Sequence, residues 1–302
     1  MPRLGTHLAG GDLHIAGTVY ADAFVGPLTG DTAGTHTGPV ATDDLRLRDV
    51  RLVAPPPNTS AELLAALGLT SVAAWRLDQV GLASGTVASF GDLAATLTLA
   101  GTPTIGHPLA SPNGGSARGI YFDASTGDAL SADVLDPGAG SFIAGARLGF
   151  VGDPAGTSHH LFGRIKPGAG NGWAIYVGDT GDLLYWISDG THTFSGTLAA
   201  GILALGSPPL EVVPQLDRSG SDPVFRARWS RNGASLGSAS VTCAALGTLT
   251  SAGQEFGFGP VPAAGPAFNG GTWAQWGWMA LGAQCEGATS PQLRAQGLGW
   301  EA

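Results

Sequence analysis

Glycine recurs at every fourth position from Gly26 to Gly38, in a stretch that reads GPLTGDTAGTHTGPVA. Side chains this small cannot cover a hydrophobic core, while ordering the backbone costs roughly 1–2 kcal/mol per residue. The stretch is therefore expected to bury itself against other chains, most simply in a homotrimer. Collagen needs glycine at every third position, whereas the interval here is four, and the flanking threonine, valine and leucine favour extended chain. The spacing predicts an intertwined, β-rich fibre stalk, with an unstructured Gly/Thr linker as the alternative.

The segment from Gly17 to Gly30, GTVYADAFVGPLTG, resembles the repeats of bacteriophage tail-fibre and head-fibre proteins. The resemblance implies that the chain is a component of a phage-like particle and is attached to it through the N-terminal stalk. It also implies location in the virion.

Composition limits the partners that the chain can have. Net charge is −9 and the single lysine is Lys166, so no basic face is expected that could neutralise phosphates, and we expect no nucleic-acid partner. The negative balance argues equally against an anionic membrane surface. The start of the chain, MPRL, has no apolar leader region, and no apolar run is long enough to cross a bilayer. We therefore expect assembly in the bacterial cytoplasm without a signal peptide.

Three regions can be separated along the chain. Residues 1–54 form the stalk and attachment region, and within them residues 45–53 alternate as one strand with arginines on one phase. Residues 55–70 contain three consecutive prolines, which interrupt a sheet, and then a short helix opened by Thr59 and Glu62 as a capping box. Residues 71–302 hold nearly all the aromatic residues and are expected to form the head.

The head shows short apolar runs separated by Gly, Pro, Asn and Asp, a pattern typical of an all-β sandwich. The expected strands are residues 72–77, 96–99, 119–122, 142–151, 160–165, 173–177, 183–188, 210–213, 224–229, 238–242, 256–259 and 273–281. Hairpins are predicted at 176–183 and at 229–236, where Asn232 and Gly233 suit a tight turn. The two cysteines, Cys243 and Cys285, are far apart in sequence, and two buried thiols are favoured over a disulfide.

The order of these elements resembles the laminin-G/concanavalin-A-like jelly roll. The matching segments are 74–78, 119–123, 172–176, 231–233 and 278–282. The resemblance implies a jelly-roll head after the fibre stalk. It also raises calcium as a cofactor of that family.

No catalytic motif in the sequence stands in the structural context that its chemistry needs. Retaining glucanases on this fold need two carboxyl groups about 5–5.5 Å apart, but the five glutamates lie far from one another in sequence. The G-x-S-x-G match at residues 233–237 falls in a hairpin and not at a strand-to-helix elbow. His159 and His160 are adjacent on a strand, so they point to opposite faces and cannot form a metal pair; one is expected to be exposed and the other packed. We therefore expect no enzyme.

Carbohydrate binding is the remaining function, because aromatic side chains can stack on sugar rings and loops at the rim of a sandwich supply polar groups. The candidates for carbohydrate binding are Trp173, Tyr185, Trp186 and Trp273. Regular alternation places Trp276 and Trp278 on one side of their strand, packed between the sheets, and Trp273 on the other, exposed. The candidates for calcium are aspartates in predicted loops, whose carboxylates suit a hard cation: Asp123, Asp128, Asp179, Asp182 and Asp189.

The sequence thus favours a trimeric virion fibre or spike whose head binds a host surface polysaccharide for adsorption. Two alternatives stay open. The first is a purely structural or decoration protein of the particle. The second is a depolymerase whose site forms between chains.

Overall fold

The structure is a computed structural model in which the chain separates into two units, Met1–Asn58 and Thr59–Ala302. The described residues are 24–28, 34–38, 44–47, 50–53, 69–78, 85–100, 103–110, 116–122, 128–131, 135–151, 158–165, 170–203, 207–231, 234–250, 255–259 and 271–286. The helix predicted before residue 68 lies outside them. The division between the units falls inside the stretch assigned above to the linker.

The N-terminal unit contains two antiparallel hairpins. Strand β1 (Phe24–Leu28) pairs with β2 (Gly34–Gly38), and β3 (Asp44–Leu47) pairs with β4 (Val50–Val53). The expectation of one continuous strand over 45–53 is therefore wrong, because β3 and β4 pair antiparallel with each other. Doubling back lets each short strand pair its backbone groups with the other, which a single isolated strand cannot do.

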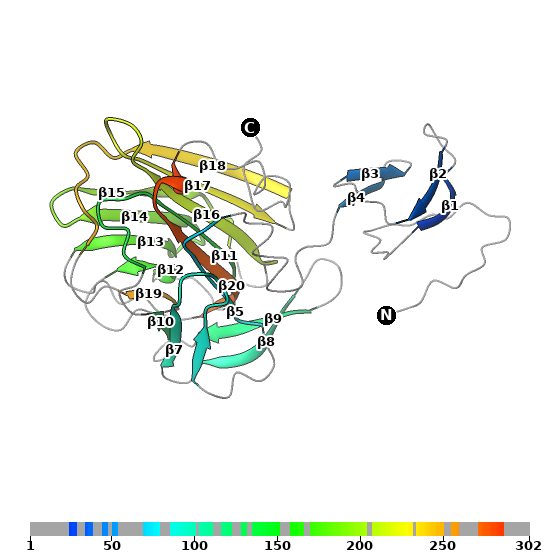
Figure 1. Ribbon diagram of the computed structural model, residues 1–302. Helices are drawn as coiled ribbons and strands as arrows, with labels where there is room; N and C mark the ends of the chain where they lie inside the picture. The colour runs from blue at the N-terminus through cyan, green and yellow to red at the C-terminus, as the bar shows by residue number, and fades with distance from the viewer. Residues whose placement is uncertain are drawn as a thin grey trace. The chain divides into compact units, whose positions relative to one another are not determined.

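The C-terminal unit is a sandwich of two eight-stranded antiparallel sheets (Figure 1). The first sheet has the order β15-β14-β13-β12-β19-β10-β7-β6, and the second has the order β18-β17-β16-β11-β20-β9-β8, with β5 beside β20. The first comprises β6 (Thr86–Ala88), β7 (Thr96–Ala100), β10 (Asp128–Ser131), β12 (His159–Ile165), β13 (Asn171–Val177), β14 (Leu183–Asp189), β15 (Thr193–Ala199) and β19 (Glu255–Phe258). The second comprises β5 (Val72–Arg76), β8 (Thr104–Ala110), β9 (Ser116–Phe122), β11 (Phe142–Phe150), β16 (Leu210–Asp217), β17 (Val224–Arg231), β18 (Ala234–Thr242) and β20 (Thr272–Leu281).

Aromatic side chains fill the space between the sheets. Phe142 of the second sheet stacks on Trp173 of the first with ring centroids 4.7 Å apart, and Trp75 stacks on Phe256 at 5.3 Å. The strands alternate, so even-numbered residues of β11 point into this core and odd-numbered ones point away from it. The jelly-roll-like sandwich expected from the sequence is confirmed, as are all twelve predicted strands and both hairpins.

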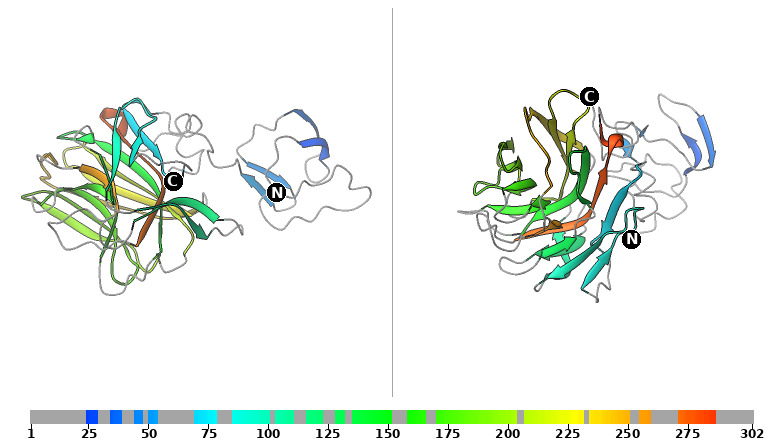
Figure 2. Two further views of the ribbon diagram at one scale, coloured as in Figure 1. Left: turned by 90° about the horizontal axis from the view of Figure 1, so that it is seen from below. Right: turned by 60° about the vertical axis from the view of Figure 1, so that its left-hand side comes forward.

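The tryptophans of β20 do not follow the predicted alternation. Gln275 is an extra residue, because Trp276 pairs with Arg147 and Ala274 with Leu148. This β-bulge resets the phase and puts Trp273, Trp276 and Trp278 all on the outer face, whereas the prediction placed two of them between the sheets. Strand β20 runs between β11 on one side and β5 and β9 on the other (Figure 2).

The two ends of the described part of the sandwich are fastened to each other. The backbone N–H of Thr70 donates to Gln284 Oε1 at 2.8 Å, and the Gln284 side-chain amide donates back to the carbonyl of Thr70. Gln284 belongs to a 3-10 helix, η2 (Ala283–Cys285). Cys285 and Cys243 are both buried and free, as predicted, and burial raises the pKa of the Cys285 thiol to about 12. Among the described residues, no helix has the length and apolarity needed to span a membrane.

Candidate functional site

A partly exposed aromatic pair lies on the outer face of the first sheet. Trp186 on β14 stands opposite Ala174 on β13, and Tyr176 stands two residues further along β13, opposite Leu184. Trp186 and Tyr176 are therefore diagonal neighbours, a spacing of about 7–8 Å that aromatic side chains bridge. We call this surface the β14 face: Trp186, Tyr176, Leu184, Ser195 and Thr197.

Very small residues lie next to Trp186 across the sheet. The row that starts at Trp186 continues through Ala174, Gly163 and Gly257. A Cβ at Gly163 would come within 2.4 Å of the carbonyl oxygen of Trp173, so the close approach of the backbone requires glycine here. All three of these small residues are buried, so the exposed surface beside the indole lies on its other flank.

The other flank of Trp186 is lined by hydroxyl groups. Ser195 pairs with Trp186 and Thr197 pairs with Leu184, and both residues are exposed on the edge strand β15. Strands β13, β14 and β15 contribute no charged side chain to this face, since Asp189 has the inward phase. An exposed hydroxyl can both donate and accept a hydrogen bond, so this face suits neutral, hydroxyl-rich ligands.

His160, on β12, packs beside the same row of small residues. The residue is fully buried, its Nε2 lies 3.2 Å from the position of a Cβ at Gly163, and its Nδ1 is 2.7 Å from the carbonyl oxygen of Gly259. Because a carbonyl only accepts, Nδ1 carries the proton. Burial lowers the pKa of His160 to about 4, which keeps the ring neutral near pH 7. His159 is also buried and packs edge-on against Phe150, so the expectation that one of these histidines is exposed is wrong.

The structure keeps one of the four predicted sugar-binding aromatics on the surface. Trp173 is buried between the sheets, and Tyr185 points the same way and stacks on Phe225 at 5.1 Å. Trp273 is fully buried too, because it lies across Gly119 and donates from Nε1 to the carbonyl of His107 at 3.0 Å. The prediction that Trp273 is exposed is therefore wrong, and Trp186 remains the candidate.

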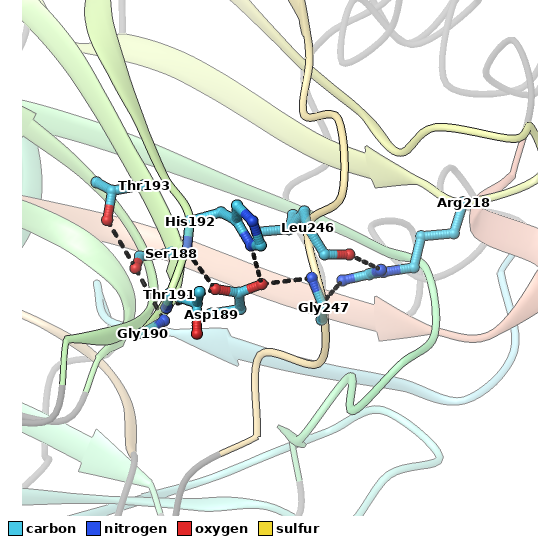
Figure 3. Close-up of polar contacts among 9 residues, drawn as sticks. All are labelled: Ser188, Asp189, Gly190, Thr191, His192, Thr193, Arg218, Leu246 and Gly247. Carbon is cyan, nitrogen blue, oxygen red and sulfur yellow. Dashed lines mark hydrogen bonds and ion pairs between the residues drawn. The ribbon is translucent and has the colours of Figure 1, made fainter.

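Asp189 ties two loops together and does not present open oxygens (Figure 3). Its Oδ1 accepts the backbone N–H groups of Thr191 at 2.7 Å and His192 at 2.6 Å, and its Oδ2 accepts that of Gly247 at 2.5 Å. The side chain is only 7% exposed. Burial alone would raise the pKa of Asp189, but the bonds from His192, Gly247 and Thr191 outweigh it and hold the pKa well below its usual range.

The segment that carries Gly247 is held from a second side as well. Arg218 donates from Nη1 to the carbonyl of Leu246 at 3.0 Å and from Nη2 to that of Gly247 at 2.5 Å (Figure 3). The chain between β18 and β19 is thus anchored to the β14–β15 hairpin by Asp189 and to the β16–β17 connection by Arg218. This arrangement is structural, since donors already occupy both oxygens of the carboxylate.

The other calcium candidates do not gather around Asp189. Asp182 accepts the backbone N–H of Gly201 at 2.6 Å, and Asp179 lies exposed in the turn after β13. Asp128 lies on β10, and Asp123 falls outside the described residues. Within the described segments, no three His, Cys, Asp or Glu residues come together as a cation site. Calcium binding stays a prediction.

Two glutamates, Glu211 and Glu286, have structural partners. Glu211 forms an ion pair with Arg147 Nε at 3.3 Å and accepts from Ser230 Oγ at 3.3 Å, whereas Glu286 accepts from Ser141 Oγ at 3.2 Å. Ser235, of the G-x-S-x-G match, lies opposite Ser230 in the β17–β18 hairpin. This context is a strand pair and not the elbow that a nucleophilic serine needs.

Sequence reasoning missed Tyr176 and the hydroxyl row of β15. The signal was present, because residues 193–199 alternate as Thr-Phe-Ser-Gly-Thr-Leu-Ala. That alternation is typical of a half-buried strand, but its mild hydrophobicity made it look like a loop. Tyr176 follows once the phase of β13 is known from Trp173.

Comparison with known proteins supports the fold alone. No protein-family model matches the chain, and no curated protein does. Among solved structures, a receptor-binding domain has a TM-score of 0.50 at 9% identity, over 75% of this chain and 50% of that chain.

Two further structures match at lower scores. The binding domain of botulinum neurotoxin DC in complex with rat synaptotagmin II has a TM-score of 0.48 at 10% identity, over 75% of this chain and 50% of that one. A structure of botulinum neurotoxin type C, whose cell entry depends upon interaction with two ganglioside molecules, has a TM-score of 0.47 at 11% identity, over 75% and 51%. This chain spans about half the length of these structures. Likeness at this level of identity identifies no ligand.

Proposed function

We propose that the chain is a trimeric fibre or spike of a phage-like particle, and that its sandwich binds a host cell-surface glycan without cleaving it. The observation that carries the binding role is the β14 face, where Trp186 and Tyr176 remain partly exposed beside a row of hydroxyls. Sugar rings have one apolar face and many hydroxyls, so an indole edged by Ser and Thr matches both.

The trimer and the particle rest on the N-terminal sequence. The four-residue glycine period and the GTVYADAFVGPLTG segment support a fibre stalk. A trimer would present three copies of the site, and several weak contacts to one surface add up to firm attachment.

Glycan-array binding by the full chain tests the binding role. We expect neutral glycans to bind, and Trp186→Ala to reduce that binding about tenfold, the loss expected for one aromatic stacking contact. Thr98→Ala is the control, because Thr98 is exposed on the same face but four strands from Ala174 along the same row. No glycan binding, with an intact thermal transition, would favour the decoration protein.

Two further measurements address the rest of the proposal. Sedimentation equilibrium should return a trimer at micromolar concentration, and a monomer would contradict the fibre. Release of reducing sugar from the bound polysaccharide would establish the depolymerase instead.

A further inference from the structure

A second in-register row crosses the outer face of the other sheet. It consists of Arg76, Trp276, Arg147, Glu211 and Ser230, which lie on β5, β20, β11, β16 and β17. We call these five residues the β20 face. Neighbours in such a row have Cβ atoms about 4.5–5.5 Å apart, so Trp276 lies directly between two arginines.

Trp276 is the tryptophan of β20 that keeps exposed surface. Trp278 is fully buried on the same face, where it lies across Gly145 and packs with Val72, Ala74 and Cys285. Trp276 only borders that cluster and remains partly exposed. Its ring thus has a supported edge and an accessible part, as a stacking platform requires.

The two arginines beside Trp276 differ in how they are held. Arg76 forms a two-pronged contact with Asp78, from Nε to Oδ1 at 2.8 Å and from Nη2 to Oδ2 at 2.6 Å. Arg147 contacts Glu211 only through Nε, at 3.3 Å, and its side chain is 15% exposed. In the part of the chain that the structure describes, we find no hydrogen bond from the terminal nitrogens of Arg147.

A guanidinium that is mostly desolvated but incompletely bonded favours an anion with matching geometry. Its two terminal nitrogens form a planar fork that fits a carboxylate through two parallel hydrogen bonds. Glu211 occupies the Nε side and is itself held by Ser230 Oγ. The fork of Arg147 is therefore the position that an incoming carboxylate would take, next to the accessible indole.

We infer that the β20 face is a second sugar-binding site, specific for an acidic sugar whose ring stacks on Trp276 and whose carboxylate pairs with Arg147. The inference rests on the proposed function only in taking a sugar as ligand, since its residues lie on the opposite sheet from Trp186.

The test uses the full chain labelled with 5-fluorotryptophan and observed by 19F NMR. The signal of Trp276 is identified by its loss in Trp276→Phe, and that of Trp186 by its loss in Trp186→Phe. D-glucuronate is titrated against D-glucuronamide, which has the same ring and no charge. We expect the Trp276 signal to shift with glucuronate at a Kd about tenfold or more below that for glucuronamide, as a charge-assisted pair implies.

Paired variants separate binding from folding. Glu211→Gln removes the competing carboxylate and should tighten glucuronate binding. The double variant Arg147→Gln/Glu211→Gln removes both charges of this ion pair together and should lose the preference for glucuronate, with an unchanged thermal transition as the check on folding. Arg226→Gln removes an arginine that pairs with Asp217 on the same sheet and should change the Kd less than twofold.

An equal response of Trp276 to both sugars would overturn the inference, and so would a preference that survives the double variant. The Trp186 signal reports on the proposed function separately. Glucuronate binding at Trp276 without neutral glycans at Trp186 would keep the inference and refute the proposed site.

Discussion

The two outer faces of the sandwich place rings over glycines, but they cover those rings differently. On the outer face of the second sheet, Trp278 lies across Gly145 and is covered by the two ends of the described sandwich, which Thr70 and Gln284 hold together. On the outer face of the first sheet, the imidazole of His160 lies beside Gly163 and is buried, while Trp186, in the same cross-strand row as Gly163, stays partly exposed. A buried ring stabilises the fold, and an exposed ring beside it is available to a ligand.

The faces also differ in charge. Serine and threonine hydroxyls flank Trp186, whereas guanidinium groups flank Trp276. The same kind of platform thus stands in a neutral setting on one sheet and in an ionic setting on the other. Binding preference should therefore divide between the sheets by ligand charge, which the following experiments test from the largest expected effect to the smallest.

Replacement of a sealed tryptophan should give the largest loss of stability. Trp278→Ala and Trp273→Ala are each expected to lower the free energy of unfolding by about 3–5 kcal/mol, because each leaves a cavity over a glycine. Urea denaturation of the full chain measures this. Trp276→Ala serves as the comparison and should cost about 1 kcal/mol or less. Equal losses in all three would mean that Trp276 is sealed too.

Acid should destabilise the folded protein through protonation of His160. The pKa of His160 is about 4 in the folded protein, against 6.5 for an ordinary histidine, because burial disfavours the charged ring. The unfolded chain therefore takes up the proton first, and stability should fall by roughly 3 kcal/mol as pH drops from about 6.5 to about 4. His160→Gln should flatten that part of the pH dependence, and a pH dependence that the variant leaves unchanged would contradict the prediction.

Loss of the Asp189 carboxylate, an acidic group, should give an intermediate loss of stability. Asp189→Ala leaves the N–H groups of Thr191, His192 and Gly247 without their acceptor, which should cost about 2 kcal/mol at pH 7. Because the folded-state pKa is lowered, this contribution is complete above the ordinary value of 3.8 and is lost as pH falls below it. The stability gap between wild type and variant should thus close in acid, and a constant gap would contradict the role assigned to the carboxylate.

The smallest effect on folding should come from Trp186. Trp186→Ala is expected to change the free energy of unfolding by less than about 1 kcal/mol, because the ring is only partly buried. A loss as large as that for Trp278→Ala would show that Trp186 belongs to the packing and not to a binding surface.

Much of the fold could be predicted because strand patterns are local. The twelve predicted strands needed only alternation and turn residues, and the β17–β18 hairpin needed only Asn232 and Gly233. Strands without strong hydrophobicity were missed, such as β15 and the three-residue β6. Such strands form because they pair with a neighbouring strand, and the pairing cannot be read from the sequence of the strand itself.

The site was harder to predict because side-chain direction depends on register. One extra residue, Gln275, moved Trp273 to the same face as Trp276 and Trp278, and no local pattern announces that bulge. Trp173 and Tyr185 were assigned to ligand binding from residue type alone, yet their phase points them into the core. Asp179 lies in a turn as predicted, but Asp128 and Asp189 lie in strands, and the donors that occupy Asp189 come from residues 191, 192 and 247 and appear only in three dimensions.

Glycan-array binding by the full chain, Trp186→Ala and Trp276→Ala, each checked for an unchanged thermal transition, tests the division between the two faces most directly. The account predicts that Trp186→Ala loses neutral glycans and keeps acidic ones, and that Trp276→Ala loses acidic glycans and keeps neutral ones. Parallel losses in both variants, or binding that neither variant changes, would contradict it.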